Sequence, residues 1–312
     1  MLDDNQLRTV IEPHLCGEIL TITEIIGKGF MNRTFFMETT EARYIIRTRG
    51  EDVVKEYQKE KWCMEQAKAL SIPTAEVVYI GKTESMSFMI ETYIEGKNAL
   101  DCDNPEEVWF YIGKYARKLH TLPVSGFGLE LADGENGVFM NSFCQSIDEQ
   151  VDYNLSMLTT DDYFLSYGVY TNEERKDIIR IFDYIKHRKY TIGFNHGDLS
   201  RKNMLVCKDG SFVLLDYGCA IAHAVPFYDL TYIFGETVKG REPSEGMIKS
   251  FAAGYGITID ELNTMKRDIY AVMLLNAFDK VRWAYDHNDK ETEYYASFAK
   301  KVLAKTLEFS FD

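Results

Sequence analysis

One stretch near residue 200 constrains the fold more than any other part of the chain. Residues 195–203 read NHGDLSRKN and place Asp198 five positions before Asn203. Two short strands joined by a turn are predicted directly afterwards, at 204–215, and Asp216 follows the second strand. Asp198 and Asn203 precede this predicted hairpin, and Asp216 follows it. Because the two ends of a hairpin lie side by side, the arrangement brings together two carboxylates and one amide oxygen, and few folds require it.

These three side chains point to phosphate chemistry. Carboxylate and amide oxygens are hard ligands that suit Mg²⁺ beside phosphate groups. In phosphoryl-transfer sites an H-x-D-x-x-x-x-N loop supplies a base from its Asp and a metal ligand from its Asn, and the Asp of a following D-F-G holds the other metal. Asp198, Asn203 and Asp216 stand at these positions, with Tyr217 in place of Phe. The alternative is two polar loops that flank a hairpin.

The rest of the chain divides into a strand-rich part and a helical part. Alternating or apolar runs predict strands at 20–26, 33–38, 44–49, 77–81 and 87–92, with one helix among them at 52–70. Helical spacing is typical of 105–120, 141–158, 172–187, 228–238, 243–255 and 260–307. We therefore expect an α+β fold with two lobes. A small β-rich lobe with one helix spans 1–93, a hinge spans 94–97, and a large, mainly helical lobe with the catalytic loop and acceptor site spans 98–312.

The motifs together resemble the aminoglycoside phosphotransferase and choline kinase superfamily, whose fold is protein-kinase-like. The resemblance rests on HGD at 196–198 with Asn203, on DYG at 216–218 and on PFYDL at 226–230, and it extends over almost the whole chain. Within the superfamily the layout is most similar to the hygromycin B phosphotransferase branch. That similarity lies in SIPTAEV at 71–77, SGFG at 125–128 and the helical run around Asp279 and Trp283.

The resemblance implies a site for ATP (or GTP) with Mg²⁺, and the small lobe supplies most of its residues. The loop over the phosphates would include Gly27, Lys28 and Gly29, for which a plain hairpin turn is the alternative. Backbone groups of Glu91, Thr92 and Tyr93 would bind the edge of the adenine, unless this is an ordinary edge strand.

A cation in the following strand completes the expected nucleotide site. Arg47 stands where protein kinases carry a lysine, and it can make bidentate phosphate contacts. The family spacing pairs it with Glu60 in the predicted helix. Glu56, one turn earlier, is the alternative partner, and a solvated helix face is the other interpretation.

Several residues near the catalytic loop have supporting or undecided roles. By resemblance, His196 orients the loop and Asp229 braces it from the next helix, so neither is counted as catalytic. Lys202 is a candidate contact for the transferring phosphoryl group, or a solvated lysine. Many relatives have an acidic residue where this chain has Cys219. We expect its thiol to fill a small buried space, and a reactive cysteine is the alternative.

Net charge limits the partners of the chain. Its 312 residues carry 35 Lys and Arg against 49 Asp and Glu, a net charge of −14 that repels nucleic acids and anionic membrane surfaces. No apolar run reaches the roughly 18 residues of a membrane span, and the first residues are acidic rather than signal-like. We expect a cytosolic protein without nucleic-acid, membrane or obligate protein partners.

The segment between Lys118 and Arg175, called the acidic window below, indicates the charge of the acceptor independently of the family resemblance. No Lys or Arg lies between Lys118 and Arg175, whereas ten Asp and Glu do. A solvated acidic face is one explanation. The other is an acceptor site for a cation, with aromatic rings among the carboxylates. The candidate acceptor residues are Asp148, Asp152, Asp161, Asp162, Asp279, Trp283 and Asp286.

These features favour an ATP- and Mg²⁺-dependent phosphotransferase that acts on a hydroxyl of a small, cationic acceptor such as an aminoglycoside. A kinase for choline, another amino alcohol or a sugar would use the same residues. A nucleotide-binding pseudoenzyme is the third reading, against which the intact Asp198, Asn203 and Asp216 argue.

Overall fold

The chain forms two compact units in the computed structural model, which describes residues 4–26 and 32–311. The first unit holds the described residues up to Asp103 together with Lys202–Gly218, and the second holds Asn104–Arg201 and Cys219–Asp312. The segment 94–97, expected to be a hinge, belongs to the first unit. It does so because β6 (Gly96–Asn98) pairs with β11 (Met204–Cys207), a strand more than a hundred positions later in the chain.

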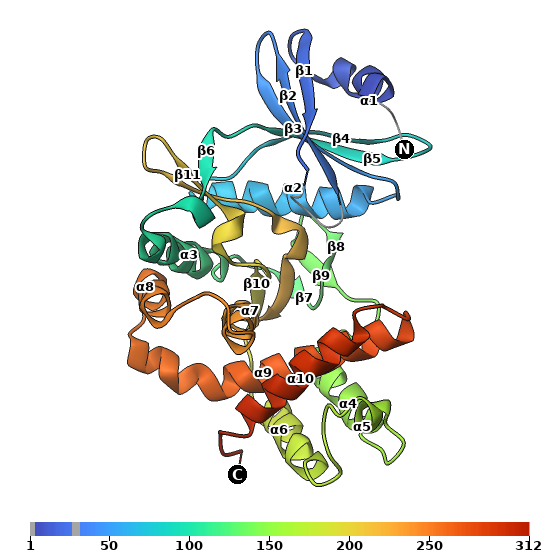
Figure 1. Ribbon diagram of the computed structural model, residues 1–312, viewed down its shortest axis with the longest axis vertical. Helices are drawn as coiled ribbons and strands as arrows, with labels where there is room; N and C mark the ends of the chain where they lie inside the picture. Colours follow the sequence, from blue (N-terminus) through green and yellow to red (C-terminus); the bar gives the residue numbers. More distant parts are fainter. Residues whose placement is uncertain (1–3, 27–31, 312) are drawn as a thin grey trace. The chain divides into compact units, whose positions relative to one another are not determined.

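The first unit is built on a five-stranded antiparallel sheet in the order β1-β2-β3-β5-β4 (Figure 1). Its strands are β1 (Ile19–Glu24), β2 (Arg33–Thr39), β3 (Arg43–Arg49), β4 (Val77–Lys82) and β5 (Ser87–Thr92). Its helices are α1 (Asp4–Ile11) and α2 (Val54–Ala69), with short 3₁₀ turns η1 (Glu12–His14) and η2 (Ala99–Asp101).

The two faces of this sheet are covered by different helices. Side chains alternate between faces along a strand, so Phe88 and Ile90 lie on one face and Met89 on the other. The first face packs with Leu7 and Ile11 of α1. Met89 packs instead with Val53 and Tyr57, at the start of α2. The strand β5, near the middle of the sheet, is therefore buried on both faces.

A second sheet in this unit carries the hairpin predicted after the catalytic loop. β11 pairs antiparallel with β12 (Phe212–Leu214), and β6 adds a third strand in the order β12-β11-β6. At the end of the hairpin opposite the turn, the Leu215 amide donates a hydrogen bond of 2.9 Å to the Asn203 carbonyl. Asn203 and Asp216 therefore flank neighbouring strand ends.

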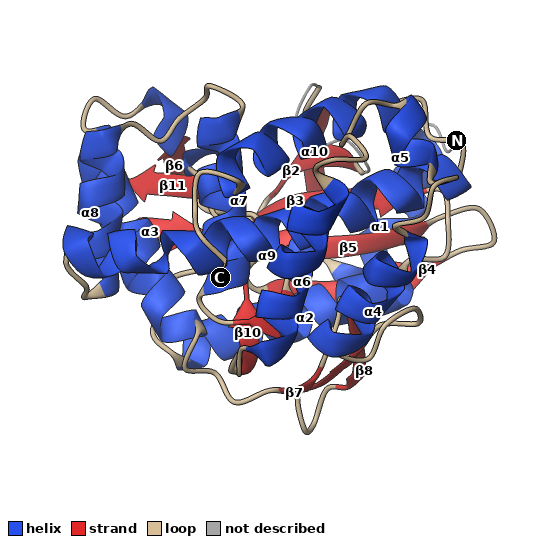
Figure 2. Cartoon of the chain, turned by 90° about the horizontal axis from the view of Figure 1, so that it is seen from below, coloured by secondary structure: helices blue, strands red, loops and turns tan. Residues whose placement is uncertain are grey.

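The second unit is mainly helical. Its helices are α3 (Pro105–Leu119), α4 (Ile147–Met157), α5 (Tyr163–Ser166), α6 (Arg175–His187), α7 (Phe227–Val238), α8 (Glu245–Tyr255), α9 (Ile259–Asp286) and α10 (Thr292–Thr306). α9 is the central element of this unit, because α4, α6, α7, α8 and α10 all pack against it (Figure 2).

Two glycines let α3 and α8 pack backbone against backbone. A Cβ at Gly113 of α3 would lie 2.1 Å from the Phe251 carbonyl oxygen, and one at Gly254 of α8 would lie 1.9 Å from the Phe110 carbonyl oxygen. Neither position tolerates a side chain without a shift of the helices.

Short strands place the catalytic loop in the second unit. β10 (Ile192–Asn195) pairs antiparallel with β13 (Ile221–Ala224), with Asn195 opposite Ile221. The loop 196–201 begins where β10 ends and continues into η3 (Arg201–Asn203). A further small sheet has the order β7-β9-β8, formed by β7 (Ser125–Gly126), β9 (Val138–Met140) and β8 (Glu130–Asp133).

The α+β architecture is confirmed, with an N-terminal antiparallel sheet and its helix followed by a helical part. The helical run expected over 260–307 is divided, because Asn288 has a positive φ of 50° and the Asp289 amide donates to the Ala284 carbonyl, which ends α9. α4 begins at Ile147 rather than near 141, capped by Ser146. None of the described helices is long and apolar enough to cross a bilayer.

Candidate active site

The catalytic loop has a backbone conformation that only glycine adopts without strain at its second position. Gly197 has φ = 80°, and a Cβ there would lie 2.2 Å from the carbonyl oxygen of Cys219. The glycine of the HGD motif is therefore explained by close approach of two backbone segments. Cys219 itself has an exposed side chain, so the expectation that its thiol fills a buried space is wrong.

Asp229 of α7 holds the start of this loop. Its carboxylate accepts hydrogen bonds from the amides of His196 (3.0 Å) and Gly197 (2.7 Å), and its side chain is fully buried. His196 in turn lies in the core, where its Nδ1 accepts a hydrogen bond from the Asp198 amide at 3.3 Å. Both residues have the contacts of loop supports.

A buried histidine supports Asp229 in turn. Nε2 of His120, at the end of α3, lies 3.0 Å from an Asp229 carboxylate oxygen, and Nδ1 lies 2.9 Å from the Tyr255 hydroxyl. Burial alone would raise the pKa of the Asp229 carboxyl, but the interactions with His120, chiefly its hydrogen bond, and the bond from the Gly197 amide outweigh burial and lower the pKa. Asp229 therefore stays ionised.

Asp198 lies on the same loop and is 8% exposed. Tyr232, one turn after Asp229 on α7, forms a side-chain hydrogen bond with Asp198. Burial raises the pKa of the Tyr232 hydroxyl, and the charge and hydrogen bond of Asp198 raise it further. Because the hydroxyl keeps its proton, it donates to the carboxylate and orients it.

The first unit contributes Asn203 and Asp216, the two expected metal ligands. Asn203 is buried at the end of η3, and Asp216 has the positive φ of 62° that few residues other than glycine adopt. One carboxylate and one amide at adjacent strand ends fit Mg²⁺, which takes one or two protein ligands and completes its shell with water and phosphate oxygens. Over residues 4–26 and 32–311, no three His, Cys, Asp or Glu side chains gather to hold a metal by themselves.

Arg47 is the centre of a buried charged cluster in the first unit. Its guanidinium forms an ion pair with Glu60, and its Nε lies 3.1 Å from a Glu91 carboxylate oxygen. Burial would lower the pKa of Arg47, but Glu91, Glu60 and Asp216 raise it overall. Glu56, the alternative partner, instead pairs with Arg49 at 2.8 Å.

The same cluster also contains Glu91, and the pKa of its carboxyl is raised. Burial raises its pKa, and the charges of Glu60 and Asp216 raise it further, while Arg47 opposes them. The side chain of Glu91 thus faces Arg47. The amides of Thr92 and Tyr93 donate to carbonyls of Glu76 and Arg43, so the sheet already uses both donors.

Four further residues were expected to contact the nucleotide phosphates, namely Gly27, Lys28, Gly29 and Lys202. Gly27, Lys28 and Gly29 lie outside the described residues. Lys202 has an exposed side chain, and its carbonyl accepts a hydrogen bond from Asn98 at 3.0 Å.

Two of the candidate acceptor carboxylates lie on α9 near an aromatic ring. Asp279 accepts hydrogen bonds from Gln150 and Asn154 of α4. Burial raises the pKa of Asp279 to about 6, against the lowering effects of Asn154, Gln150 and Arg282. Burial raises the pKa of the Tyr153 hydroxyl, and the charges of Asp286 and Asp279 raise it further, against the effect of Arg282.

Asp279 is also coupled electrostatically to the surroundings of the catalytic loop. Burial raises the pKa of the Tyr228 hydroxyl, and the charges of Cys219, Asp229 and Asp279 raise it further. Tyr228 therefore has both the loop brace and Asp279 within electrostatic range.

The other candidate acceptor residues are arranged differently. Asp162 is buried, bonded to Tyr170 at 2.9 Å and to Arg282 at 3.1 and 3.3 Å, which gives it the contacts of a scaffold residue. Asp152 pairs with Lys186 at the surface. Trp283 is 46% exposed, with the ammonium of Lys280 3.9 Å from its ring centre. Asp148 and Asp161 are exposed.

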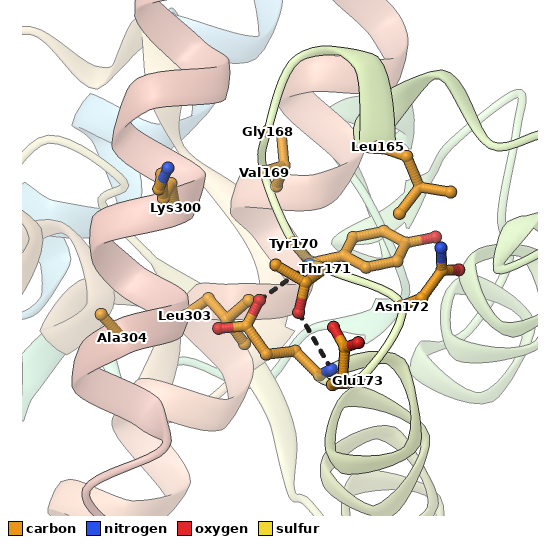
Figure 3. Close-up of a pocket in the computed structure, with 11 residues that line it drawn as sticks. Leu165, Gly168, Val169, Tyr170, Thr171, Asn172, Glu173, Lys300, Leu303 and Ala304 are labelled. Atoms are coloured by element: carbon orange, nitrogen blue, oxygen red, sulfur yellow. Dashed lines mark hydrogen bonds between the residues drawn. The ribbon is translucent and has the colours of Figure 1, made fainter.

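A cavity of about 480 Å³ lies elsewhere in the second unit, between the segment that joins α5 to α6 and the helix α10 (Figure 3). Glu173 and Glu174 of the acidic window border it, but Glu174 bonds with Thr171 rather than pointing to an open space. No residue of the catalytic loop 196–201 lines this cavity, so we do not assign the acceptor to it.

Comparison with known proteins identifies the family of the chain. The model of the phosphotransferase enzyme family (APH) matches residues 22–266, well over half of the chain, so the chain belongs to that family. No curated protein sequence matches it significantly.

Solved structures of similar fold include two antibiotic phosphotransferases and a putative fructosamine-3-kinase. A thermostable mutant of the aminoglycoside phosphotransferase APH(4)-Ia, in a ternary complex with ADP and hygromycin B, is 15% identical with a TM-score of 0.66, over 95% of this chain and 97% of the other. Spectinomycin phosphotransferase APH(9)-Ia with ADP and spectinomycin is 15% identical with a TM-score of 0.61, over 99% of each chain. A putative fructosamine-3-kinase from Haemophilus somnus is 12% identical with a TM-score of 0.61, over 96% of each chain. At these identities the likeness concerns the fold.

Sequence reasoning missed Tyr232, His120 and Tyr255. Tyr232 follows Asp229 by three positions, so helical spacing was a usable signal for it. His120 and Tyr255 reach Asp229 from α3 and the end of α8, and no local pattern joins those segments.

Proposed function

We propose that this protein transfers the γ-phosphoryl group of ATP to a hydroxyl of a small acceptor, with Mg²⁺ as cofactor. The observation that carries the proposal is the position of Asn203 and Asp216 at neighbouring strand ends, in a chain that belongs to a phosphotransferase family. The structural neighbours bound to ADP support the choice of nucleotide.

Each charged group has a distinct task in this proposal. Asn203 and Asp216 hold Mg²⁺, which when bound offsets the charge of the phosphates. Arg47, kept in place by Glu60, contacts the α- and β-phosphates. Asp198 accepts or orients the proton of the acceptor hydroxyl, with its carboxylate oriented by Tyr232.

The acceptor in this proposal carries a positive charge. The charges of Asp286 and Asp279 both act on the hydroxyl of Tyr153, and a combination of carboxylates and an aromatic side chain favours an ammonium group. Of the seven candidate residues, these two aspartates are the ones we retain as acceptor contacts, whereas Asp162 serves the scaffold through Arg282. An aminoglycoside has the required ammonium groups and hydroxyls.

A metabolite kinase is the second candidate. The fold similarity to a putative fructosamine-3-kinase favours an amino sugar derivative as the acceptor, and choline or another amino alcohol would carry the same charge. A pseudoenzyme that only binds nucleotide is the remaining alternative.

The test is a coupled assay of ADP formation from ATP and Mg²⁺ with hygromycin B, spectinomycin, choline, fructosamine and neutral sugars. We expect turnover with at least one cationic acceptor, and none when Mg²⁺ is chelated. A best acceptor that is neutral would contradict the charge argument. Nucleotide binding without turnover on any acceptor would favour the pseudoenzyme.

A further inference from the structure

Arg201 of the catalytic loop is tied to a carboxylate far away in the sequence. Its guanidinium makes two parallel bonds to Glu242, with Nε 2.5 Å and Nη2 2.6 Å from the two carboxylate oxygens. The side chain of Arg201 is 11% exposed and that of Glu242 is 31% exposed. Glu242 lies between α7 and α8, so this pair connects the loop to the connection between two helices.

A third residue holds Glu242 from another helix. The indole Nε1 of Trp109, buried in α3, donates to Glu242 Oε1 at 2.8 Å. Burial acts to raise the pKa of Glu242, but the bonds from Arg201 and Trp109 outweigh it and lower the pKa. The carboxylate therefore remains charged at neutral pH, and the contact with Arg201 persists.

The loop is thereby anchored on both sides of Asp198. On one side, Asp229 binds the amides of His196 and Gly197. On the other, Arg201 binds Glu242 three positions after Asp198. The Arg201–Glu242 contact is the one of these two anchors that lies between Asp198 and Asn203.

We propose that Arg201 and Glu242 are a positioning pair, which sets the place of the Asp198 carboxylate for phosphoryl transfer. The inference rests on the proposed function, because it takes Asp198 as the group that handles the acceptor proton. Misplacement of a catalytic group by about 1 Å costs on the order of 10²-fold in rate. Loss of the pair therefore lowers kcat and leaves nucleotide binding, which uses residues of the first unit, little changed.

The test compares Arg201→Gln, Glu242→Gln and the double variant. The probe is ADP formation from ATP and Mg²⁺, with water as acceptor and with the best acceptor of the screen. Each single variant is expected to lower kcat about 10- to 10²-fold with the KM for ATP changed less than about threefold. The double variant should lose no more than either single one, because the two residues act as a unit. Arg201→Lys should recover only part of the rate, since an ammonium cannot make two parallel bonds.

A matched control separates positioning from stability. Arg188 likewise makes two parallel hydrogen bonds to the carboxylate of Asp268, at 3.0 and 3.1 Å. Both residues belong to the same unit and lie outside the loop 196–201. Arg188→Gln is expected to lower Tm and leave kcat unchanged. Hydrogen exchange of the amides of 196–202 should become faster in Arg201→Gln and not in Arg188→Gln. Trp109→Phe keeps a ring in the core and removes one bond to Glu242, so it gives a milder variant if Arg201→Gln does not fold.

The outcomes distinguish this inference from the proposed function. If Asp198→Ala keeps full turnover, the role of Asp198 is wrong, and its positioning pair falls with it. If Asp198→Ala is inactive while folded Arg201→Gln and Trp109→Phe keep the wild-type kcat, only the positioning inference is overturned. A loss of kcat in Arg201→Gln no larger than that in Arg188→Gln overturns it as well.

Discussion

The charged cluster around Arg47 and the one around Arg201 are built alike but differ in charge balance. Arg201 faces one carboxylate, Glu242, whose remaining hydrogen bond comes from a neutral indole. Arg47 is surrounded by Glu60, Glu91 and Asp216, all of which act on its pKa. Even when Lys59, which bonds to the Gly218 carbonyl, is counted, two cations face three carboxylates there.

The difference separates a support from a binding site. In the Arg201–Glu242 pair one positive and one negative charge neutralise each other, so no bound ion is required for the pair to hold the backbone in place. Asp216 is exposed, whereas Glu60 and Glu91 are buried. Burial raises the pKa of the Glu91 carboxyl, the charges of Glu60 and Asp216 raise it further, and a cation bound beside these carboxylates would relieve their repulsion. In the proposed function, the cluster around Arg47 binds a nucleotide that arrives with Mg²⁺, and the Arg201–Glu242 pair holds the loop in place.

The largest effect is expected from Asp216→Asn, which removes charge from the unbalanced cluster. The variant should lose about 10³-fold or more in kcat, because a neutral amide cannot offset the metal charge as a carboxylate does. Steady-state kinetics at saturating Mg²⁺ measure this, and a thermal melt checks the fold. Near-normal activity would remove Asp216 from the metal site.

Asp198→Ala should have the next largest effect. We expect a loss of about 10²- to 10⁴-fold in kcat, typical of a general acid–base group. The Kd for ATP, measured by calorimetry, should stay within a factor of about three, since Asp198 belongs to the second unit. If ATP affinity fell as much as kcat, Asp198 would have a structural role instead.

Arg47→Ala tests the nucleotide side of the comparison. The KM for ATP should rise about tenfold or more, as expected when one charge-assisted contact with phosphate is lost, while the KM for the acceptor changes little. Arg49→Ala is the matched control, because Arg49 lies on the same strand and pairs with Glu56 near the surface. An unaltered ATP dependence would move the phosphate contact elsewhere, with Lys28 as the next candidate.

The pH dependence of acceptor binding tests Asp279. Its pKa is about 6, so the carboxyl is neutral below that pH and negative above it. The KM for a cationic acceptor should therefore rise about tenfold per pH unit as the pH falls below 6, and level off above 7. Asp279→Asn should raise the KM at pH 8 and flatten this profile. Glu135→Gln, in an exposed part of the acidic window, is the control.

Salt gives the smallest effect. The Debye length shortens from about 10 Å at 0.1 M to about 3 Å at 1 M, so contacts between a cationic acceptor and partly exposed Asp286 weaken. The KM for the acceptor should rise several-fold over this range. An unchanged KM would mean that the acidic window is a solvated face.

The order of residues along the chain was sufficient for the fold class, and it brought forward the residues proposed for the site. The spacing of Asp198, Asn203 and Asp216 around a hairpin is a local pattern, and strand and helix periodicity depends on near neighbours. The Arg47–Glu60 pair followed from family spacing. The break between α9 and α10 was missed, because the left-handed residue that ends α9 is Asn288 rather than the glycine that usually signals such an end.

Tertiary structure alone decided which of the candidate acidic residues are paired in the core. Asp162 and Asp279 are both aspartates with aromatic residues nearby in the sequence. Of these two, Asp162 accepts hydrogen bonds from the buried guanidinium of Arg282 in α9. In the same way, Glu242 reads as an ordinary loop glutamate until the fold brings it to Arg201 and Trp109. Such pairs join segments dozens of residues apart. The free energy of a buried charge depends on the partners that folding brings to it, and the sequence alone does not specify those partners.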